Sequence, residues 1–358
     1  MCVIRPHNRF FYVHLWYPYR YLPLVGEGCP TYTVIGFERL SQDRFKRYIA
    51  FKSGNMFSGK FSMYNVILLC SDGSGALSHQ LVNSVYSSLG GQDLLWLGHN
   101  EAVCFNVEKQ SNEFSSVWAE LQLSKIDMVI RKKENHFKSL LLADMDSTMI
   151  EQECIDELAD MYGVGSKVKK ITTRAMNGEL GFQDALNERV ALLAQCPNSI
   201  IEHVLERRIT FRSGGKALVS TMKSNGAYTA LVSGGFTAFS TPVSEILGFD
   251  EHHANILVEE NGIFTGQVAD PILGRNEKVN RLNRLVQDRG LSHKDVLAVG
   301  DGANDLGMLE LAGMGVAMHA KRIVAEKCDI VINHCDLTSL LYLQGYRKED
   351  FVETEINH

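Results

Sequence analysis

The stretch LLLADMDST, residues 140–148, decides the fold of the larger part of this chain, because an apolar run there ends abruptly in two carboxylates. A short continuous apolar run is typical of a parallel strand buried on both faces. Open α/β sheets bind ligands at the carboxyl ends of such strands, which is where Asp144 and Asp146 stand. Two neighbouring acids repel each other, and bound Mg²⁺, which prefers oxygen ligands, relieves the repulsion. Taken alone, the stretch also fits an Asp cap on the next helix.

The surrounding residues 137–345 continue the pattern of apolar segments separated by helical ones. Strands are expected at 140–145, 228–232, 296–299, 316–318 and 330–332. Strands that alternate with helices are typical of α/β proteins, so we expect a Rossmann-like, doubly wound parallel sheet.

Two connections in this sheet are too long for simple crossovers. The first follows Asp146, and its helical segments are expected at 151–162, 164–176, 182–193 and 199–207. They predict a helical cap at about 151–210, which at this edge of the sheet can act as a lid. The second connection, 254–268, contains Asn261-Gly262 between alternating residues, which predicts a β-hairpin with a type I′ turn.

Two further segments offer groups that suit an anion. Residues 230–236, ALVSGGF, run from a strand into a small turn, so the Ser233 hydroxyl and the backbone at Gly234 can approach a ligand closely. Ser-Gly-Gly is also an ordinary turn. Lys278 stands near the start of a helix expected at 277–288 and would supply a point charge for a phosphate. A lone Lys at such a position is otherwise a common surface residue.

The segment VGDGAND, residues 299–305, again ends a strand in carboxylates on a glycine-rich turn. It does not match a dinucleotide-binding loop, because Asp305 stands where the last Gly of G-x-G-x-x-G belongs. Acids in this loop would also repel a pyrophosphate unless a metal ion intervened.

Together, these segments predict a metal-dependent site for phosphoryl transfer. The acids that supply oxygen ligands for Mg²⁺ are Asp144, Asp146 and Asp301. The donors for phosphoryl oxygens are Ser233, the backbone at Gly234, Lys278 and Asn304. Phosphoryl transfer depends mostly on positioning and charge neutralisation. An Asp carboxylate can also attack phosphorus and form an acyl phosphate.

The motifs DMDST, SGGF, a downstream Lys and GDGAND, in this order, resemble those of the haloacid dehalogenase-like phosphatases. The resemblance covers about residues 138–345 and includes EQECIDE at 151–157 and AMNGEL at 175–180. It is closest to the members that hydrolyse O-phospho-L-serine in the last step of L-serine biosynthesis. It implies a cytoplasmic, Mg²⁺-dependent phosphoric monoester hydrolase that works through an aspartyl-phosphate. It does not extend to residues 1–137.

The resemblance also implies a role for each matching residue. Asp144 matches the nucleophile, and Asp146 matches the general acid that protonates the departing serine oxygen and then acts as the base. Mg²⁺ would be held by the Asp144 carboxylate, the Asp146 main-chain carbonyl and Asp301. The phosphoryl group would contact Ser233, Gly234, Lys278 and Asn304, with Asp305 orienting Lys278.

In the cap, the resemblance assigns substrate choice to two charged residues. Glu153 matches the residue that meets the substrate ammonium, and Arg189 matches the partner of its carboxylate. Met176 and Phe182 match apolar positions that exclude water. Read without the resemblance, Glu153 fits a first-turn helix acid and Arg189 a solvated helix residue. Where many relatives carry Pro-Gly, residues 212–215 read RSGG, a departure that we expect to change only the stiffness of the turn.

Residues 65–131 have the order βαββαβ, which is the ferredoxin-like pattern. The order resembles that of ACT-type regulatory domains, which often bind amino acids. Residues 1–24 are rich in aromatics and Arg without an apolar core and predict a poorly defined extension. We therefore divide the chain into 1–24, an α+β domain at 25–137 and the phosphatase domain at 138–358. Whether the chain forms a homodimer, and whether the α+β domain binds an amino acid, stay open.

Composition excludes several other classes of protein. The formal charge of −6 over 358 residues does not favour a nucleic-acid partner. There is no apolar run of the roughly 20 residues that a membrane helix needs. The eight Cys form no C-x-x-C, so no zinc or redox motif is indicated. The alternatives left are a phosphatase of another small metabolite and an amino-acid-sensing regulatory protein with an inert sheet domain.

Overall fold

The computed structural model describes residues 3–7, 10–14, 63–71, 73–109, 113–133, 137–176 and 179–352, and of residues 3–7, 10–14 and 176 it describes the backbone alone. Contacts divide the chain into two units, residues 1–61 and 62–358. In the first unit, β1 (Val3–His7) and β2 (Phe10–His14) form an antiparallel pair. The domain boundary expected near residue 25 lies outside the described residues.

A parallel sheet of six strands forms the centre of the second unit. Its strands are β7 (Leu140–Ala143), β8 (Tyr228–Phe236), β9 (Glu251–Asn255), β12 (Val296–Gly300), β13 (Met314–Met318) and β14 (Ile330–Ile332). Their order is β14-β13-β12-β7-β8-β9, and every neighbouring pair is parallel. The chain therefore adds strands first to one side of β7 and later to the other, which places ligands at the carboxyl end of β7. The predicted doubly wound sheet is confirmed.

Strand β9 was not predicted. Its sequence, EHHAN, has no apolar run, and four of its five residues are only half-buried because it is the edge strand next to β8. A strand at an edge pairs on one side only, so its side chains need not be apolar.

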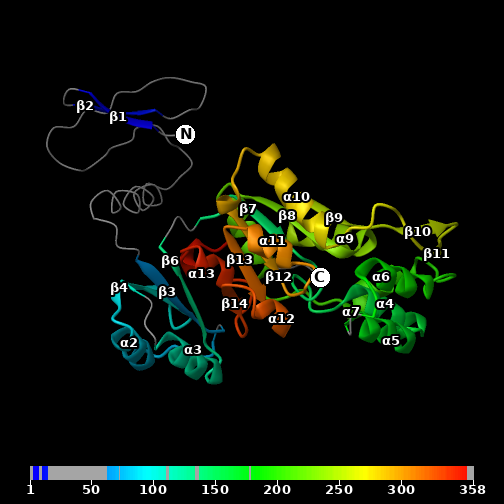
Figure 1. Ribbon diagram of the computed structural model, residues 1–358, viewed down its shortest axis with the longest axis horizontal. Coiled ribbons are helices and arrows are strands. Elements are labelled where there is room, and N and C mark those ends of the chain that lie inside the picture. Colours follow the sequence, from blue (N-terminus) through cyan, green and yellow to red (C-terminus); the bar gives the residue numbers. More distant parts are fainter. Residues whose placement is uncertain are drawn as a thin grey trace. The chain divides into compact units, whose positions relative to one another are not determined.

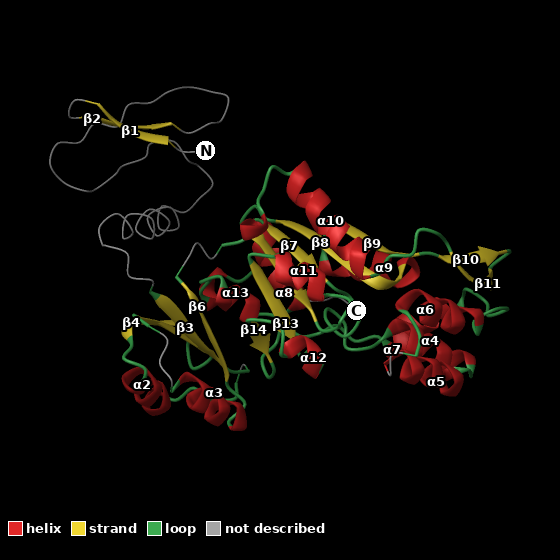
Figure 2. Ribbon diagram, in the orientation of Figure 1, coloured by secondary structure: helices red, strands yellow, loops and turns green. Residues whose placement is uncertain are grey.

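Helices cover both faces of this sheet (Figures 1 and 2). Leu141 and Ala143 share a core with α8 (Gly215–Ser224), α9 (Thr237–Leu247) and α13 (Ser339–Leu343). Leu140 and Leu142 point the other way, toward α10 (Arg275–Asp288), α11 (Leu306–Leu311) and α12 (Arg322–Ala325). Each of the three leucines is fully buried, which stabilises the fold by about 1.5–3 kcal/mol per side chain. The apolar run thus anchors the strand that carries Asp144.

The helical cap consists of α4 (Cys154–Tyr162), α5 (Gly165–Met176), α6 (Phe182–Ala191) and α7 (Ile200–Arg208). The predicted hairpin is present as β10 (Leu257–Glu260) and β11 (Ile263–Val268), and both turn residues have positive φ, 51° at Asn261 and 77° at Gly262. The hairpin packs on the loop that follows α6, where Gln195 N donates to Phe264 O at 2.9 Å. Both long connections therefore contribute to one cap at one end of the sheet (Figure 1).

The α+β domain has the predicted ferredoxin-like order. Its elements are β3 (Tyr64–Leu69), α2 (His79–Ser88), β4 (Gln92–Gly98), β5 (Ala102–Val107), α3 (Phe114–Leu123) and β6 (Asp127–Lys132). The sheet is antiparallel in the order β4-β5-β3-β6. Val66 and Leu68 face α2 and α3, whereas Ile67 and Leu69 share the core of the parallel-sheet domain. Helix α2 begins at His79 because the Ser78 hydroxyl caps it, accepting from Leu81 N at 3.2 Å.

The described residues also include two short 3₁₀ helices, η1 (His293–Asp295) and η2 (Lys348–Asp350). Among the described residues, no helix has both the length and the apolar character that crossing a bilayer requires.

Candidate active site

The site is built around a buried ammonium group. Lys278 Nζ donates to Asp144 Oδ1 at 2.5 Å and to Asp305 Oδ1 at 2.6 Å. The three side chains are 0%, 5% and 0% exposed. Burial by itself lowers the pKa of Lys278, but the two carboxylates outweigh burial and raise the pKa above its ordinary value. Lys278 therefore keeps its positive charge. Because its side chain is 0% exposed, it is not a surface lysine.

Each of these groups is placed by a different element of the sheet domain. Asp144 directly follows β7, and its N–H donates to the Val299 carbonyl of β12 at 3.0 Å. Lys278 lies in the first turn of α10. Asp305 ends the loop after β12, where its Oδ2 accepts from Gly302 N at 2.9 Å and so closes the glycine-rich turn. Segments distant in sequence meet because parallel strands end at one edge.

A third acid, Asp301, joins this group. Oxygens of Asp144, Asp301 and Asp305 lie within 4.8 Å of one another, and all three residues are buried. Burial raises the pKa of Asp301 to about 6, while burial and the nearby Asp305 carboxylate raise the pKa of Asp144 well above its usual range. Three acids leave an excess of negative charge over the buried Lys278 ammonium, even with the partly exposed Lys321 ammonium 3.7 Å from Asp301. Hard oxygen donors with excess negative charge fit a divalent cation.

The Asp146 carboxylate lies outside that cluster and makes different contacts. Its Oδ1 accepts from the backbone N–H of Cys154, the first residue of α4, at 2.8 Å. Its Oδ2 accepts from Ser233 Oγ at 2.9 Å. Burial and the Glu153 carboxylate raise the pKa of Asp146, which suits a group that must hold a proton. The Asp146 carboxylate thus both caps α4 and faces the site. The helix-cap and active-site interpretations of this acid are therefore compatible.

The Ser-Gly-Gly segment, predicted as a turn, forms the last part of strand β8 and approaches Asp146 closely. Ser233 Oγ accepts from Gly235 N at 2.8 Å, and a Cβ on Gly235 would lie only 2.5 Å from Asp146 Oδ2. A larger residue at 235 would therefore displace the Asp146 carboxylate. A Cβ on Gly234 would lie 3.9 Å from Asn304 Nδ2 and 3.4 Å from Phe182 Cζ. Asn304 and the cap residue Phe182 thus both lie close to Gly234.

The two charged cap residues each interact electrostatically with Asp146. Glu153 precedes α4, and its Oε1 accepts from Ser147 Oγ at 3.0 Å. Arg189, on α6, is half-buried and donates from Nε to the Ala185 carbonyl at 3.2 Å. Burial lowers the pKa of Arg189, although Asp156 and Glu153 act in the opposite direction. Within the described part of the chain its guanidinium forms no ion pair, so it is available to a carboxylate ligand.

The structure describes the side chain of one of the two apolar cap residues, Phe182, but not that of the other, Met176. Phe182 begins α6 and is 39% exposed, with its ring against Gly234 and Gly274. Met176 ends α5, and its side chain lies outside the described residues.

Lys321 also lies at the site, although the sequence pattern was not read as placing it there. Its Nζ lies 3.8 Å from Glu153 Oε1 and 3.7 Å from Asp301 Oδ2, between the cap and the acid cluster. Lys321 follows β13 at the same edge of the sheet as the other site residues. The rule applied to the other strands, that polar residues after a buried strand reach this edge, would have identified it.

Comparisons with known proteins agree with this geometry. Residues 141–310 match the family model of the haloacid dehalogenase-like hydrolases. A phosphoserine phosphatase of Archaeoglobus fulgidus is 43% identical over 206 residues, 58% of this chain and 60% of that protein. One of Methanocaldococcus jannaschii is 41% identical over 204 residues, 57% of this chain and 96% of that protein. A solved HAD family hydrolase of Salmonella enterica has a TM-score of 0.70 at 27% identity and covers 78% of this chain and 98% of its own.

The matched residues include β7, the cap, β8 and most of the β12 loop, so the likeness spans the whole acid–lysine cluster. With 96% of a relative covered at 41% identity, this chain belongs to the haloacid dehalogenase-like hydrolase family, among relatives that bear the name phosphoserine phosphatase.

Proposed function

We propose that this chain hydrolyses O-phospho-L-serine to L-serine and inorganic phosphate, with Mg²⁺ as cofactor and an aspartyl-phosphate on Asp144 as intermediate. The observation that carries the proposal is the buried cluster of Asp144, Lys278 and Asp301 beneath a cap that offers Arg189 without an ion pair among the described residues. The names of the relatives support the same substrate.

In the first step, a carboxylate oxygen of Asp144 attacks phosphorus. A bond forms between that oxygen and phosphorus while the bond from phosphorus to the serine oxygen breaks. Lys278, 2.5 Å from Asp144, donates to the phosphoryl oxygens and to the nucleophile, so it draws both together. The acid Asp146, whose pKa is raised, delivers its proton to the departing serine oxygen.

In the second step, Asp146 is a carboxylate and takes a proton from water. The water oxygen attacks phosphorus, the bond to Asp144 breaks, and phosphate leaves. Ser233 Oγ, 2.9 Å from Asp146, keeps that carboxylate oriented through both proton transfers. The cycle ends with Asp144 ionised and Asp146 protonated, as it began.

Mg²⁺ would be held by the carboxylates of Asp144 and Asp301 together with the main-chain carbonyl of Asp146. When bound, it would neutralise charge on the phosphoryl oxygens, which repel the attacking carboxylate. The excess of three acids over one buried lysine supports this assignment.

The cap would select serine by its two charged groups. Glu153 would meet the ammonium, and the planar guanidinium of Arg189 would pair with the carboxylate through two parallel hydrogen bonds. Phe182, whose ring lies against Gly234, would exclude water from the phosphoryl group.

The test is phosphate release from a panel of phosphomonoesters, with and without Mg²⁺. We expect O-phospho-L-serine to have the highest kcat/KM and chelation to stop the reaction. A preference for a phosphorylated metabolite without an amino acid group would favour the alternative of a sister phosphatase. No turnover of any ester would favour an amino-acid-sensing protein, although the complete acid–lysine cluster speaks against an inert sheet domain.

The biological role, the location and the assembly of the enzyme also belong to what we propose. Hydrolysis of phosphoserine would be the last step of L-serine biosynthesis, since its product is the free amino acid. A cytoplasmic location, a homodimer and an amino-acid ligand on the α+β domain stay predictions.

A further inference from the structure

The residues between Asp146 and the cap hold two groups of the site in place. Ser147 has a φ of 56°, a left-handed conformation that is strained for a residue with a side chain. From this position Ser147 Oγ donates to Glu153 Oε1 at 3.0 Å. Next to it, Thr148 Oγ1 donates to Asp301 Oδ1 at 3.3 Å. A strained backbone persists only where the surroundings over-determine it, so something must hold this loop.

Arg212 is the residue that holds it. Its Nη2 donates to the Ser147 carbonyl at 2.8 Å and its Nε to the Thr148 carbonyl at 3.0 Å. Its backbone N–H donates to the next carbonyl, that of Met149, at 2.9 Å. One residue thus binds three consecutive carbonyls, and the rigid guanidinium fixes two of them in a set geometry.

His319 orients the guanidinium in turn. Arg212 Nη1 lies 3.2 Å from His319 Nδ1, and His319 Nε2 lies 2.7 Å from the Cys335 carbonyl. A carbonyl only accepts, so Nε2 carries the ring proton and Nδ1 is left to accept from Arg212. The neutral imidazole thereby links Arg212 to the segment after β14.

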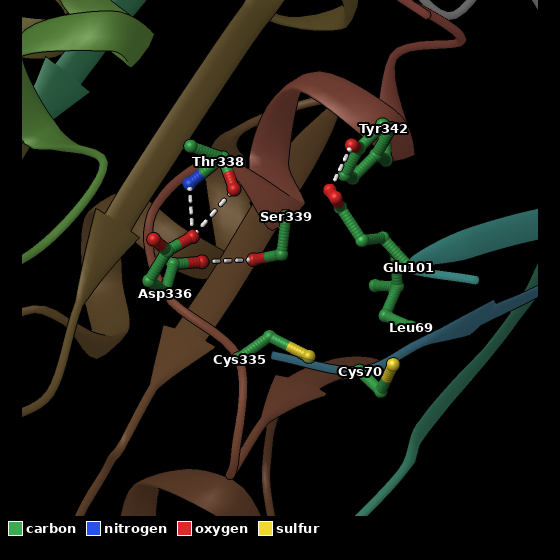
Figure 3. Close-up of a pocket in the computed structure, with 8 residues that line it drawn as sticks. All are labelled: Leu69, Cys70, Glu101, Cys335, Asp336, Thr338, Ser339 and Tyr342. Carbon is green, nitrogen blue, oxygen red and sulfur yellow. Dashed lines mark hydrogen bonds between the residues drawn. The ribbon is translucent and has the colours of Figure 1, made fainter. Parts of the chain in front are cut away.

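That segment is fastened to the α+β domain by Ser71, by Gln122 and above all by the Asp127 carboxylate. Asp127, fully buried at the start of β6, accepts from the backbone N–H groups of Asn333, His334 and Cys335, each at 3.0 Å. Figure 3 shows Cys335 close to Cys70, at the end of β3. The contacts therefore form a continuous chain from the α+β domain to the loop beside Asp146.

We propose that Arg212 is a positioning residue for substrate recognition, which sets Glu153 through the carbonyl and hydroxyl of Ser147, and that Asp127 supports it from the α+β domain through Cys335 and His319. The inference rests on the proposed function, because it takes Glu153 to be the group that meets the substrate ammonium. Arg212 itself touches neither the acid cluster nor Lys278.

A purely structural role for Arg212 would predict a different outcome from a positioning role. Loss of stability lowers the amount of active enzyme equally for every substrate. Displacement of Glu153 weakens the binding of only those substrates that carry an ammonium group. A pair of phosphate esters with and without that group therefore separates the two roles.

The experiment compares Arg212→Gln and Arg212→Lys with the unaltered full-length protein. KM and kcat are measured for O-phospho-L-serine and for the phosphate ester of 3-hydroxypropionate, which lacks only the ammonium. For Arg212→Gln we expect KM for phosphoserine to rise about tenfold or more, the size of a lost hydrogen bond to a charged group. KM for the other ester should change less than about threefold. For Arg212→Lys, KM for phosphoserine should lie between the values of the unaltered protein and of Arg212→Gln. Arg208→Gln, an exposed arginine paired with Glu157, is the matched control and should change neither KM.

His319→Ala and Asp127→Asn should shift the two KM values in the same direction as Arg212→Gln but by less, because they act through Arg212. Equal changes for both esters, or no change in folded Arg212 variants, would overturn the inference while leaving the proposed function intact. If Arg212→Gln does not fold, Arg212→Lys decides on the same criterion. If the unaltered protein does not turn over phosphoserine, the proposed function fails, and this inference fails with it.

Discussion

The two ends of the candidate site are built differently. At the phosphoryl end, Asp144, Lys278 and Asp305 are almost fully buried, and the lysine contacts both acids at 2.5 and 2.6 Å. At the cap end, Arg189 is half-buried and Phe182 is 39% exposed. The first set stands at strand ends and on a helix of the sheet domain, the second on the cap helix α6. Chemistry and recognition therefore rest on different elements, and we expect kcat and KM to be separable by mutation.

The largest effect should come from removing the nucleophile at the buried end. Asp144→Asn keeps the shape of the side chain but cannot form an acyl phosphate, so kcat should fall on the order of 10⁴-fold or more. Phosphate release and trapping of the phosphorylated protein measure this. Turnover retained at the original rate would refute the mechanism.

Removing the buried cation should lower stability in addition to activity. Lys278→Met leaves Asp144 and Asp305 buried without their counter-ion, so unfolding should require about 3–5 kcal/mol less free energy. Urea denaturation at neutral pH measures the difference. The matched control is Lys223→Met, which removes a short but exposed pair with Asp250 and should cost less than about 1 kcal/mol. Similar losses for both variants would show that the Lys278 cluster is not specially stabilised.

At the cap end the effect should be on KM. Arg189→Ala removes a guanidinium that would pair with the substrate carboxylate, so KM for phosphoserine should rise about 10- to 100-fold. KM for p-nitrophenyl phosphate, which has no carboxylate, should change less than about threefold. Arg174→Ala, an exposed arginine of α5 paired with Glu188, serves as control. Equal changes for both esters would mean that the cap does not recognise a carboxylate.

A smaller, pH-dependent effect should distinguish the two ends. Burial raises the pKa of Asp301 to about 6, so this carboxyl is ionised above pH 6 and protonated below it. Because Mg²⁺ binds the ionised form, the Mg²⁺ concentration for half-maximal activity should rise about tenfold per pH unit below pH 6. Titrations with Mg²⁺ after chelation measure this, and Arg189→Ala should follow the same curve. A constant requirement from about pH 5 to 7 would exclude Asp301 as a ligand.

The sequence pattern predicts the phosphoryl end of the site better than the cap end, for a physical reason. Asp144, Asp301 and Ser233 follow apolar strands, and the carboxyl ends of parallel strands always meet at one edge, so strand pattern alone brings them together. Lys278 lies on a helix, and its burial depends on how α10 packs against the sheet. Arg189 and Glu153 lie on cap helices, whose orientation over the sheet is not encoded in their periodicity. The resemblance to a family, rather than the pattern, identified them.

The sequence by itself determined the local features of this protein: buried strands, the Asn261-Gly262 turn, the ferredoxin-like order and the acids at strand ends. These depend on neighbouring residues in the chain, through hydrophobic periodicity and turn chemistry. Tertiary structure alone decided which polar groups share a buried space. It placed Asp305 with Asp144 and Asp301, gave Asp146 both a helix to cap and a serine to contact, and joined Arg212 to His319 across 107 residues. Charge pairing and hydrogen bonding at such distances depend on packing, which no local pattern specifies.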